Sequence, residues 1–310
     1  FRGESSFIDW REQSYPVWAQ PADIYMSECL GTNAAYYGVL KVMEDMATIL
    51  GKKKDVKKYG QKAEALKKAI NDNFWVEEDG YYASYLYGRQ NLTRTQQSET
   101  LGESFCVLFG IADEERAAKV ISSMPVGEFG PPIFSPQIVS QPDYHNNGVW
   151  PYVTSFWGKA AAKVGNETAL MHALACNVRT ASIYATNYEN YSFNTGNPYT
   201  TQINSPNMLW GLSGFMGLFH RTFFGLEFTK EGLALNPFVP TVLAGTRKLE
   251  AFPYRGMKLD ITVSGSGNEI ASCLVDGKEA EAFIPADWTG NHSIEIVMKG
   301  EHKPSSVNMV

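Results

Sequence analysis

Mostly apolar helical segments alternate along this chain with helical segments that are polar or mixed. The mostly apolar segments fall at residues 27–50, 96–111, 149–164 and 206–224, and only the first of them holds more than two charged residues. The polar or mixed segments between them fall at residues 55–74, 113–124 and 167–185. A helix that is apolar all round must be buried on all sides, whereas a helix with one apolar stripe buries only that stripe. The alternation therefore predicts a double ring, with the mostly apolar helices inside and the others outside.

Loop length follows the same alternation. The connections after the predicted inner helices are short, as at residues 51–53, whereas those before inner helices are long, at 75–95, 125–148 and 186–205. Long loops commonly carry function. We therefore expect the functional residues at the end of the ring where these loops gather.

From about residue 226 the apolar pattern changes to period two, which is typical of β-strands. The alternating segments are separated by Gly-rich turns and lie at residues 233–237, 247–252, 257–263, 270–275 and 292–297. The fold class is accordingly mainly α, with a helical domain at residues 1–225 and a small antiparallel β-sandwich at residues 226–310.

Composition excludes several classes of function. A formal charge of -6 and a pI near 5.5 argue against a nucleic-acid or anionic-membrane partner, because both require a basic surface. No apolar run reaches membrane-spanning length. The 4 cysteines and 5 histidines show no metal-ligand spacing, and no glycine-rich phosphate loop is present. We therefore expect buried free thiols, no metal and no cofactor.

Two acidic residues, Asp9 and Glu189, each lie just ahead of a mostly apolar helix among aromatic, hydroxyl and amide side chains. If the helices close a ring, the two carboxylates face each other across its mouth. Glycoside hydrolysis uses such a pair, one group protonating the leaving oxygen and the other activating water. A wide separation favours inversion, and an apolar neighbour such as Trp10 would raise the pKa of an acid at Asp9.

Three short stretches, taken in order, resemble the six-hairpin glycosidases, and most nearly glycoside hydrolase family 63 and the related glycogen-debranching domains. They are Asp9-Trp10 through Pro16 with Glu28 beyond it, Asn147-Gly148-Val149-Trp150-Pro151, and Glu189-Asn190-Tyr191 with Thr195-Gly196. The resemblance implies an (α/α)6 barrel of twelve helices and an inverting α-glycosidase activity. It also implies that Asp9 is the general acid and Glu189 the general base, ahead of the sixth and twelfth helices.

The candidate substrate contacts are polar and aromatic residues near these acids and in the long loops. They are Trp10, Arg11, Glu12, Trp18, Glu28, Tyr85, His145, Trp150 and Tyr191. Trp150 and Tyr191 are the main candidates for stacking on a sugar ring. Glu12 is also a rival acid, because the family's acid loop usually reads Gly-Leu-Asp-Asp or Trp-Met-Asp, and here the sequence is Ile8-Asp9-Trp10-Arg11-Glu12.

The chain has about seven barrel helices, so the resemblance implies that an upstream segment or a second chain supplies the other five. We expect a substrate of the α-linked glucoside or oligosaccharide class, and a periplasmic or secreted location is favoured over a cytoplasmic one. Two alternatives stay open. One is another six-hairpin enzyme, such as an α-L-rhamnosidase-like hydrolase or a glycoside phosphorylase. The other is a non-catalytic carbohydrate-binding domain.

Overall fold

The computed structural model describes residues 1–5, 7–8 and 14–310. The described chain divides into two compact units, each with a hydrophobic core of its own. The first unit contains residues 1–164, 168–215 and 305–310, and the second contains residues 165–167 and 216–304.

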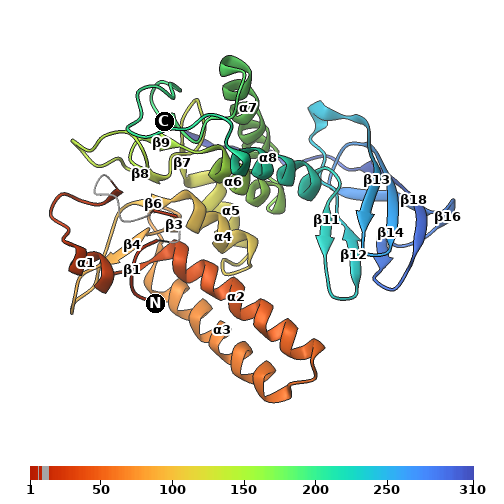
Figure 1. The fold of residues 1–310 in the computed structure, drawn as a ribbon, viewed down its shortest axis with the longest axis horizontal. Coiled ribbons are helices and arrows are strands. Elements are labelled where there is room, and N and C mark those ends of the chain that lie inside the picture. The colour runs from red at the N-terminus through yellow and green to blue at the C-terminus, as the bar shows by residue number, and fades with distance from the viewer. Residues whose placement is uncertain (6, 9–13) are drawn as a thin grey trace. The chain divides into compact units, whose positions relative to one another are not determined.

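Eight α-helices lie within the described residues (Figure 1). They are α1 (Pro21–Met26), α2 (Leu30–Ile49), α3 (Lys53–Asn73), α4 (Thr100–Leu108), α5 (Glu114–Ser123), α6 (Pro151–Lys163), α7 (Glu167–Tyr184) and α8 (Leu209–Thr222). The last seven confirm the helices predicted from periodicity. None of the described helices combines the length and apolar character that a membrane crossing requires.

The short helix α1 was not predicted, because the first helical segment expected from the sequence begins at residue 27 and prolines such as Pro21 usually interrupt helices. Pro21 instead occupies the first position of the helix. Proline fits there because its fixed φ suits a helix and its missing N–H would have no partner in the first turn.

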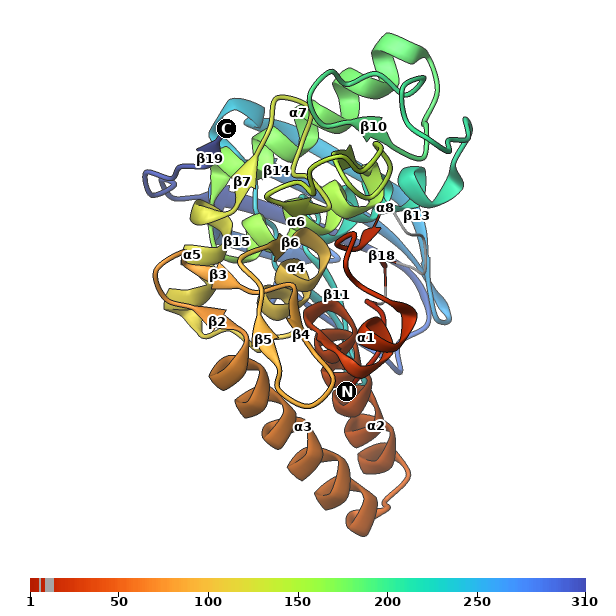
Figure 2. The ribbon, with the colours of Figure 1, turned by 90° about the vertical axis from the view of Figure 1, so that its left-hand side faces the viewer.

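The alternation of inner and outer helices is confirmed for α3 to α6. Helix α3 buries only Ala63 and Ile70, whereas most residues of α4 and α6 are buried. Helix α2 contacts α4, and α4 contacts α6, so these three form a continuous row although outer helices separate them in sequence. Helices α2 and α3 run side by side in opposite directions (Figures 1 and 2).

The expected burial of α2 and α8 on all sides is wrong for the described chain. Large apolar side chains are exposed on both helices: Val39, Val42, Met46 and Ile49 on α2, and Leu209 and Leu212 on α8. Their positions on α2 recur at helical spacing along one face. Nothing in the described part of the chain covers these side chains.

Short strands precede three inner helices and hold the long loops at one end of the row. Strand β1 (Glu28–Cys29) leads into α2, β6 (Ser98–Glu99) into α4, and β9 (Gly148–Val149) into α6. Their antiparallel partners are β4 (Tyr85–Tyr87), β8 (Phe134–Ser135) and β10 (Tyr191–Ser192). β5 (Thr93–Arg94) extends the first sheet. Strands β2 (Trp75–Val76) and β3 (Tyr81–Tyr82) form a hairpin within the predicted long loop at residues 75–95, and β7 (Pro125–Val126) pairs with β19 (Asn308–Met309).

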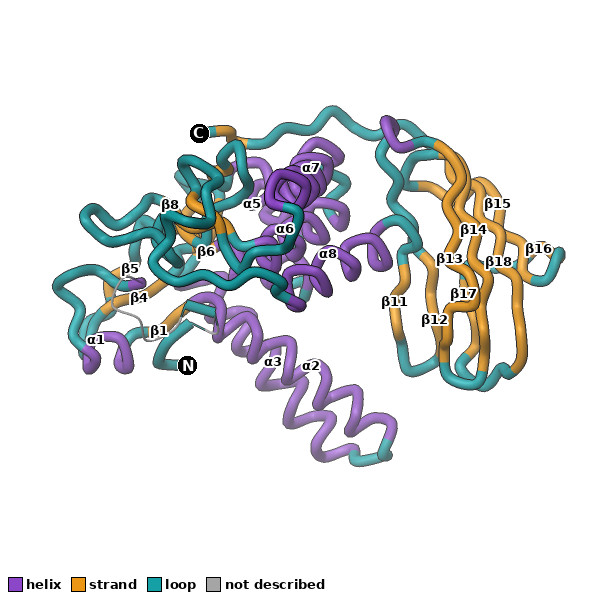
Figure 3. The backbone as a smooth tube through the Cα atoms, turned by 45° about the horizontal axis from the view of Figure 1, so that its top comes forward, coloured by secondary structure: helices purple, strands orange, loops and turns teal. Residues whose placement is uncertain are grey.

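The second unit contains two sheets that share one core. The smaller sheet has the order β11 (Leu226–Phe228), β12 (Gly232–Leu235), β17 (Phe283–Pro285). The larger has the order β13 (Gly245–Tyr254), β14 (Met257–Gly265), β18 (Gly290–Lys299), β15 (Glu269–Val275), β16 (Lys278–Glu279), as Figure 3 shows. Leu233 and Ile284 from the smaller sheet and Ile261 and Ile294 from the larger belong to this core.

All five predicted strands of this unit are confirmed, but the fully antiparallel arrangement is wrong. Strands β14 and β18 pair in parallel, with Leu259 opposite His292. The reason is topological. Strand β18 inserts between β14 and β15 and runs antiparallel to β15, so it returns in the direction of β14.

Candidate active site

The predicted acid segment lies outside the described residues. This applies to Asp9, Trp10, Arg11 and Glu12, so only the residues that border them have a described position. On one side Ile8 is buried in the core of the first unit. On the other side Ser14 is buried, and its Oγ lies 2.6 Å from Nδ1 of His145.

Glu189, the predicted base, is half-buried in the loop ahead of α8, and its backbone N–H donates to the carbonyl of Ser205 at 2.9 Å. Two positions further on, Tyr191 pairs with Val149 in the short β10–β9 sheet. The N–H of Phe193 donates to the carbonyl of Asn147 at 2.7 Å. The Glu189 loop is therefore attached to the strand that leads into α6.

The segment that borders Asp9 meets the same junction. The ring of Phe7 packs edge-on against Trp150, with the ring centroids 4.9 Å apart. Trp150 follows β9 directly and is the N-cap of α6. Two segments remote in sequence, one beside Asp9 and one beside Glu189, thus contact the strand–helix junction at residues 148–151.

Five aromatic rings, which we call the aromatic cluster, surround this junction. Its members are Phe7, His145, Trp150, Tyr152 and Trp210. Trp150 and Trp210 lie edge to face at 5.3 Å, and Tyr152 stacks on Trp210 at 5.3 Å. Phe7, Tyr152 and Trp210 are half-buried, whereas Trp150 and His145 are buried. The three half-buried rings offer the apolar and aromatic lining that small-molecule sites use.

The predicted stacking residues Trp150 and Tyr191 are 2% and 1% exposed. The indole N–H of Trp150 donates to the carbonyl of Tyr144 at 3.0 Å, and the hydroxyl of Tyr191 accepts the N–H of Tyr188 at 3.2 Å. Their stacking on a sugar stays a prediction, and neither ring has an open face here. Tyr152 and Trp210 were missed, although each falls in the first turn of an inner helix, where the long loops end.

The other predicted contacts have different surroundings. Tyr85 is buried, and its hydroxyl accepts the N–H of Ser5 at 2.7 Å. His145 is buried against Trp150, stacked at 5.2 Å. Trp18 is 60% exposed and packs edge-on against Tyr87 at 5.3 Å. The structure thus joins His145 to the aromatic cluster, while Trp18 lies at the surface.

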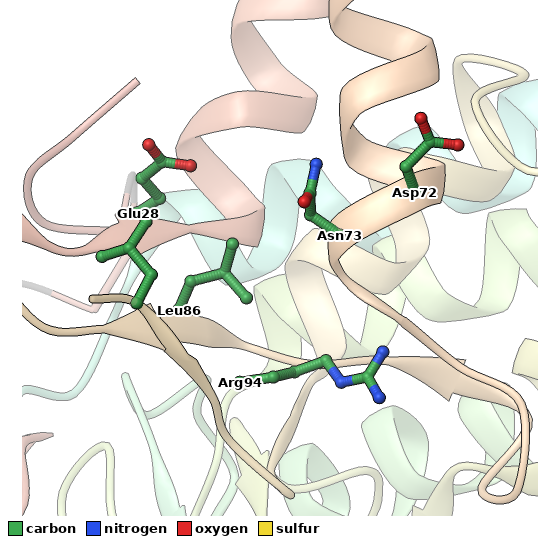
Figure 4. A pocket seen from close by; sticks show the side chains of 6 residues that line it. Glu28, Asp72, Asn73, Leu86 and Arg94 are labelled. Atoms are coloured by element: carbon green, nitrogen blue, oxygen red, sulfur yellow. The ribbon is translucent and has the colours of Figure 1, made fainter. Parts of the chain in front are cut away.

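Glu28 lies on the other face of the small β1–β4 sheet from Tyr85. Glu28 is opposite Leu86, and Cys29 is opposite Tyr85, so the two pairs of side chains point to opposite faces. Glu28 lines an open hollow of about 540 Å³ (Figure 4). The other residues that line it are Asp72, Asn73, Leu86, Leu92 and Arg94. The structure does not bring Glu28 together with the buried ring of Tyr85.

Sequence reasoning missed a buried carboxyl group, that of Glu99 at the end of β6. Its Oε1 accepts the hydroxyl of Ser5 at 3.0 Å, and its Oε2 accepts the N–H of Gly31 at 3.2 Å. Burial raises the pKa of Glu99 to about 7, and these hydrogen bonds oppose the rise. A Cβ at Gly31 would lie 2.8 Å from the carboxyl oxygen, so this contact requires glycine.

Glu103, one turn further along α4, is a second buried carboxyl group. Its Oε1 accepts the N–H of Tyr82 at 2.8 Å, and its Oε2 has no hydrogen-bond partner among the described residues. Burial raises the pKa of Glu103 well above its ordinary range, and the nearby Glu99 raises it further. Burial therefore favours the neutral form of Glu103. Glu103 was also missed, although a carboxyl group within the mostly apolar segment at residues 96–111 is a sequence feature that could have indicated it.

The four cysteines are buried free thiols, as predicted. Burial raises the pKa of Cys29 and of Cys176 to about 12, so neither is a thiolate near neutral pH. Among the residues that the structure describes, no group of three or more His, Cys, Asp or Glu residues is arranged to hold a metal ion.

The first unit thus holds a row of buried helices with long loops at one end, and the second unit holds two packed sheets. The chain belongs to the mannosylglycerate hydrolase MGH1-like glycoside hydrolase domain family, whose sequence model matches residues 11–210. The predicted superfamily and the prediction of a glycoside hydrolase are thereby confirmed.

Two solved structures support the fold. A sialidase structure aligns with a TM-score of 0.64 and 17% identity over 82% of this chain. The neutral trehalase Nth1 from Saccharomyces cerevisiae aligns with a TM-score of 0.51 and 12% identity over 63% of this chain. The chain spans 26% of the sialidase and 38% of the trehalase. No curated protein sequence matches it.

Proposed function

We propose that this domain hydrolyses an α-glycosidic bond with inversion, with Asp9 as general acid and Glu189 as general base. One observation supports this most. Phe7, two positions before Asp9, and Tyr191, two positions after Glu189, contact consecutive residues at the start of α6, Trp150 and Val149. Carboxylates carried by these two segments would approach one substrate from different sides.

The proposed chemistry assigns one proton transfer to each carboxyl group. Asp9 gives its proton to the glycosidic oxygen as the bond to the anomeric carbon breaks. Glu189 takes a proton from a water molecule, whose oxygen attacks the opposite face of that carbon. The buried Ile8 and the aromatic cluster provide apolar surroundings of the kind that raise the pKa of a carboxylic acid.

The half-buried rings of Phe7, Tyr152 and Trp210 are proposed to stack on the sugar, with Trp10, Arg11 and Glu12 as polar contacts. The substrate is proposed to be an α-linked glucoside or a related oligosaccharide. Both the family name, which cites a mannosylglycerate hydrolase, and the trehalase neighbour support hydrolysis over phosphorolysis and over mere carbohydrate binding. A periplasmic or secreted location stays a prediction.

The complete architecture is proposed to be an (α/α)6 ring in which α2 to α8 are the last seven helices, followed by the sandwich from about residue 226. The exposed apolar faces of α2 and α8 support this proposal, because these are the first and last inner helices of the row. Helices from an upstream segment, or from a second chain, would cover both faces.

The test uses the complete polypeptide and a panel of α-linked disaccharides. Asp9→Asn and Glu189→Gln should each abolish hydrolysis, and proton NMR should detect the inverted anomer first. Glu12→Gln tests the rival acid: if Glu12 is only a substrate contact, the variant should keep kcat and raise KM, whereas loss of the general acid would abolish kcat. Glu128→Gln is the matched control, because that carboxylate is largely exposed and pairs only weakly with Arg179 at 3.4 Å. Unchanged turnover in Asp9→Asn and Glu189→Gln would contradict the proposal.

A further inference from the structure

A chain of buried hydrogen bonds fixes the residue before Asp9. The hydroxyl of Tyr15 donates to the carbonyl of Ile8 at 2.9 Å, and it lies 3.3 Å from the hydroxyl of Tyr85. The hydroxyl of Tyr85 accepts the N–H of Ser5 at 2.7 Å. A carbonyl only accepts, so the Tyr15 proton points at Ile8 and Tyr85 donates to Tyr15. The direction of every bond from Ser5 to Ile8 is thereby set.

The residues that form this series of hydrogen bonds are shielded from solvent. Ser5, Ile8, Tyr15 and Tyr85 are all buried. Removing one hydroxyl would leave a buried polar group without a partner, and water could not replace it without disturbing the packing. The carboxyl group of Glu99 holds the other side of Ser5 through its hydroxyl at 3.0 Å.

A second anchor fixes the residue that follows the acid segment. Ser14 is bonded to His145, whose ring is stacked on Trp150 at 5.2 Å and packed against Tyr144 at 4.6 Å. His145 lies in the loop ahead of α6, far from Ser14 in sequence. Ile8 and Ser14, the described residues on either side of the acid segment, are therefore each hydrogen-bonded to a buried aromatic side chain.

We propose that Tyr15 and His145 are positioning residues for the general acid, and this inference rests on the proposed function. They hold Ile8 and Ser14, the described residues on either side of the segment that carries Asp9. General acid catalysis requires the acid within hydrogen-bond reach of the leaving oxygen, and a misplacement of about 1 Å costs a rate factor on the order of 100. Neither residue needs to touch the substrate to have this effect.

The variant Tyr15→Phe keeps the ring and removes the hydrogen bonds of the hydroxyl, among them those to the described residues Ile8 and Tyr85. A misplaced acid slows only those substrates whose leaving group must be protonated. We therefore expect kcat on an α-linked disaccharide to fall about 10- to 100-fold. On the matching glycosyl fluoride, whose leaving group needs little protonation, kcat should change by less than about 3-fold. Ser14→Ala should show the same selectivity, and Ser14→Thr, which keeps the hydroxyl, should restore the disaccharide rate.

Tyr82→Phe is the matched control. Tyr82 is also fully buried, and its hydroxyl donates one hydrogen bond to Asn71 at 2.7 Å. Asn71 keeps a second donor in Arg116 at 2.9 Å, so the loss is confined to one bond. This variant should lose a similar amount of stability and leave the ratio of the two rates unchanged. Hydrogen exchange should also quicken at residues 5–15 in Tyr15→Phe and not in Tyr82→Phe.

Two outcomes would overturn the inference. One is an equal loss on disaccharide and fluoride in Tyr15→Phe, which is what a general folding defect produces. The other is no loss on either. The variant Asp9→Ala distinguishes failure of the positioning role from failure of the proposed function. If Asp9→Ala spares the fluoride and Tyr15→Phe does not, only the positioning role fails. If Asp9→Ala affects neither substrate, the assignment of the acid fails.

Discussion

Replacing Glu99 by Gln should make the protein less sensitive to pH. The carboxyl group is fully buried between Ser5 and Gly31. Gln can occupy the same space, with its amide oxygen accepting the N–H of Gly31 and its amide N–H donating to the Ser5 hydroxyl. The substitution therefore removes the ionisation and keeps the geometry.

The sign and size of the effect follow from the pKa of Glu99, which burial raises from an ordinary 4.5 to about 7. A raised carboxyl pKa means that the folded state holds the proton more tightly than the unfolded state. This stabilisation is complete below pH 4.5 and is lost as the pH rises through 7. A difference of about 2.5 pH units corresponds to about 3 kcal/mol of unfolding free energy.

The assay is urea unfolding of the protein and of Glu99→Gln, measured at several values between about pH 4.5 and about pH 8. The difference in unfolding free energy between the two should shift by about 3 kcal/mol in favour of the variant across that range. Other titrating groups are present in both proteins and largely cancel. Glu103 is the exception, because the charge of Glu99 raises the pKa of Glu103, so the measured difference includes this coupling. Parallel curves for the two proteins would refute the reasoning, since Glu99 would then ionise alike in the folded and unfolded states.

Three further predictions concern the site and the exposed helices. Gly31→Ala should lower the unfolding free energy by about 2 kcal/mol in urea, because its Cβ would lie 2.8 Å from the Glu99 carboxyl oxygen. Trp210→Ala should lower kcat/KM about 10-fold, mainly through KM, if the ring stacks on the sugar, whereas Trp18→Ala should change it less than about 2-fold. Val42→Lys should cost less than about 0.5 kcal/mol in the chain described here. In the complete polypeptide it should cost about 2 kcal/mol or more if other helices cover α2. Equal costs in both forms would count against the ring.

The periodicity of apolar residues was enough to predict the long helices and the strands of the second unit. It failed at Pro21, because the pattern that breaks a helix in its interior also begins one at its first position. It also failed at β18, because alternation in a strand reports which face is buried and carries no information on the direction of its neighbour.

The candidate site was harder to predict because its parts depend on tertiary contacts. The acidic loops at Asp9 and Glu189 could be identified by their place ahead of apolar helices. Whether the other predicted residues are open to a substrate depends on their burial, which the sequence does not show. Tyr85, His145 and Trp150 were expected at a substrate, and the structure gives each a buried hydrogen bond to another loop. Glu99 was missed because it lies at the start of the helical segment predicted at residues 96–111, where the sequence does not show whether a carboxyl group faces solvent or the core.

The proposed catalytic pair and the proposed ring of helices both concern the helices α2 and α8. In the proposed ring, the segment that carries Asp9 precedes α2 and the loop that carries Glu189 precedes α8, and these two helices would be the first and last inner helices of the described chain. These same two helices expose apolar side chains that the helices between them bury. If the proposed ring is correct, the helices that cover both faces would also complete the wall of the substrate site. Substrate enclosure and full burial of α2 and α8 are therefore expected to depend on the same added helices, so that one substitution such as Val42→Lys should weaken both.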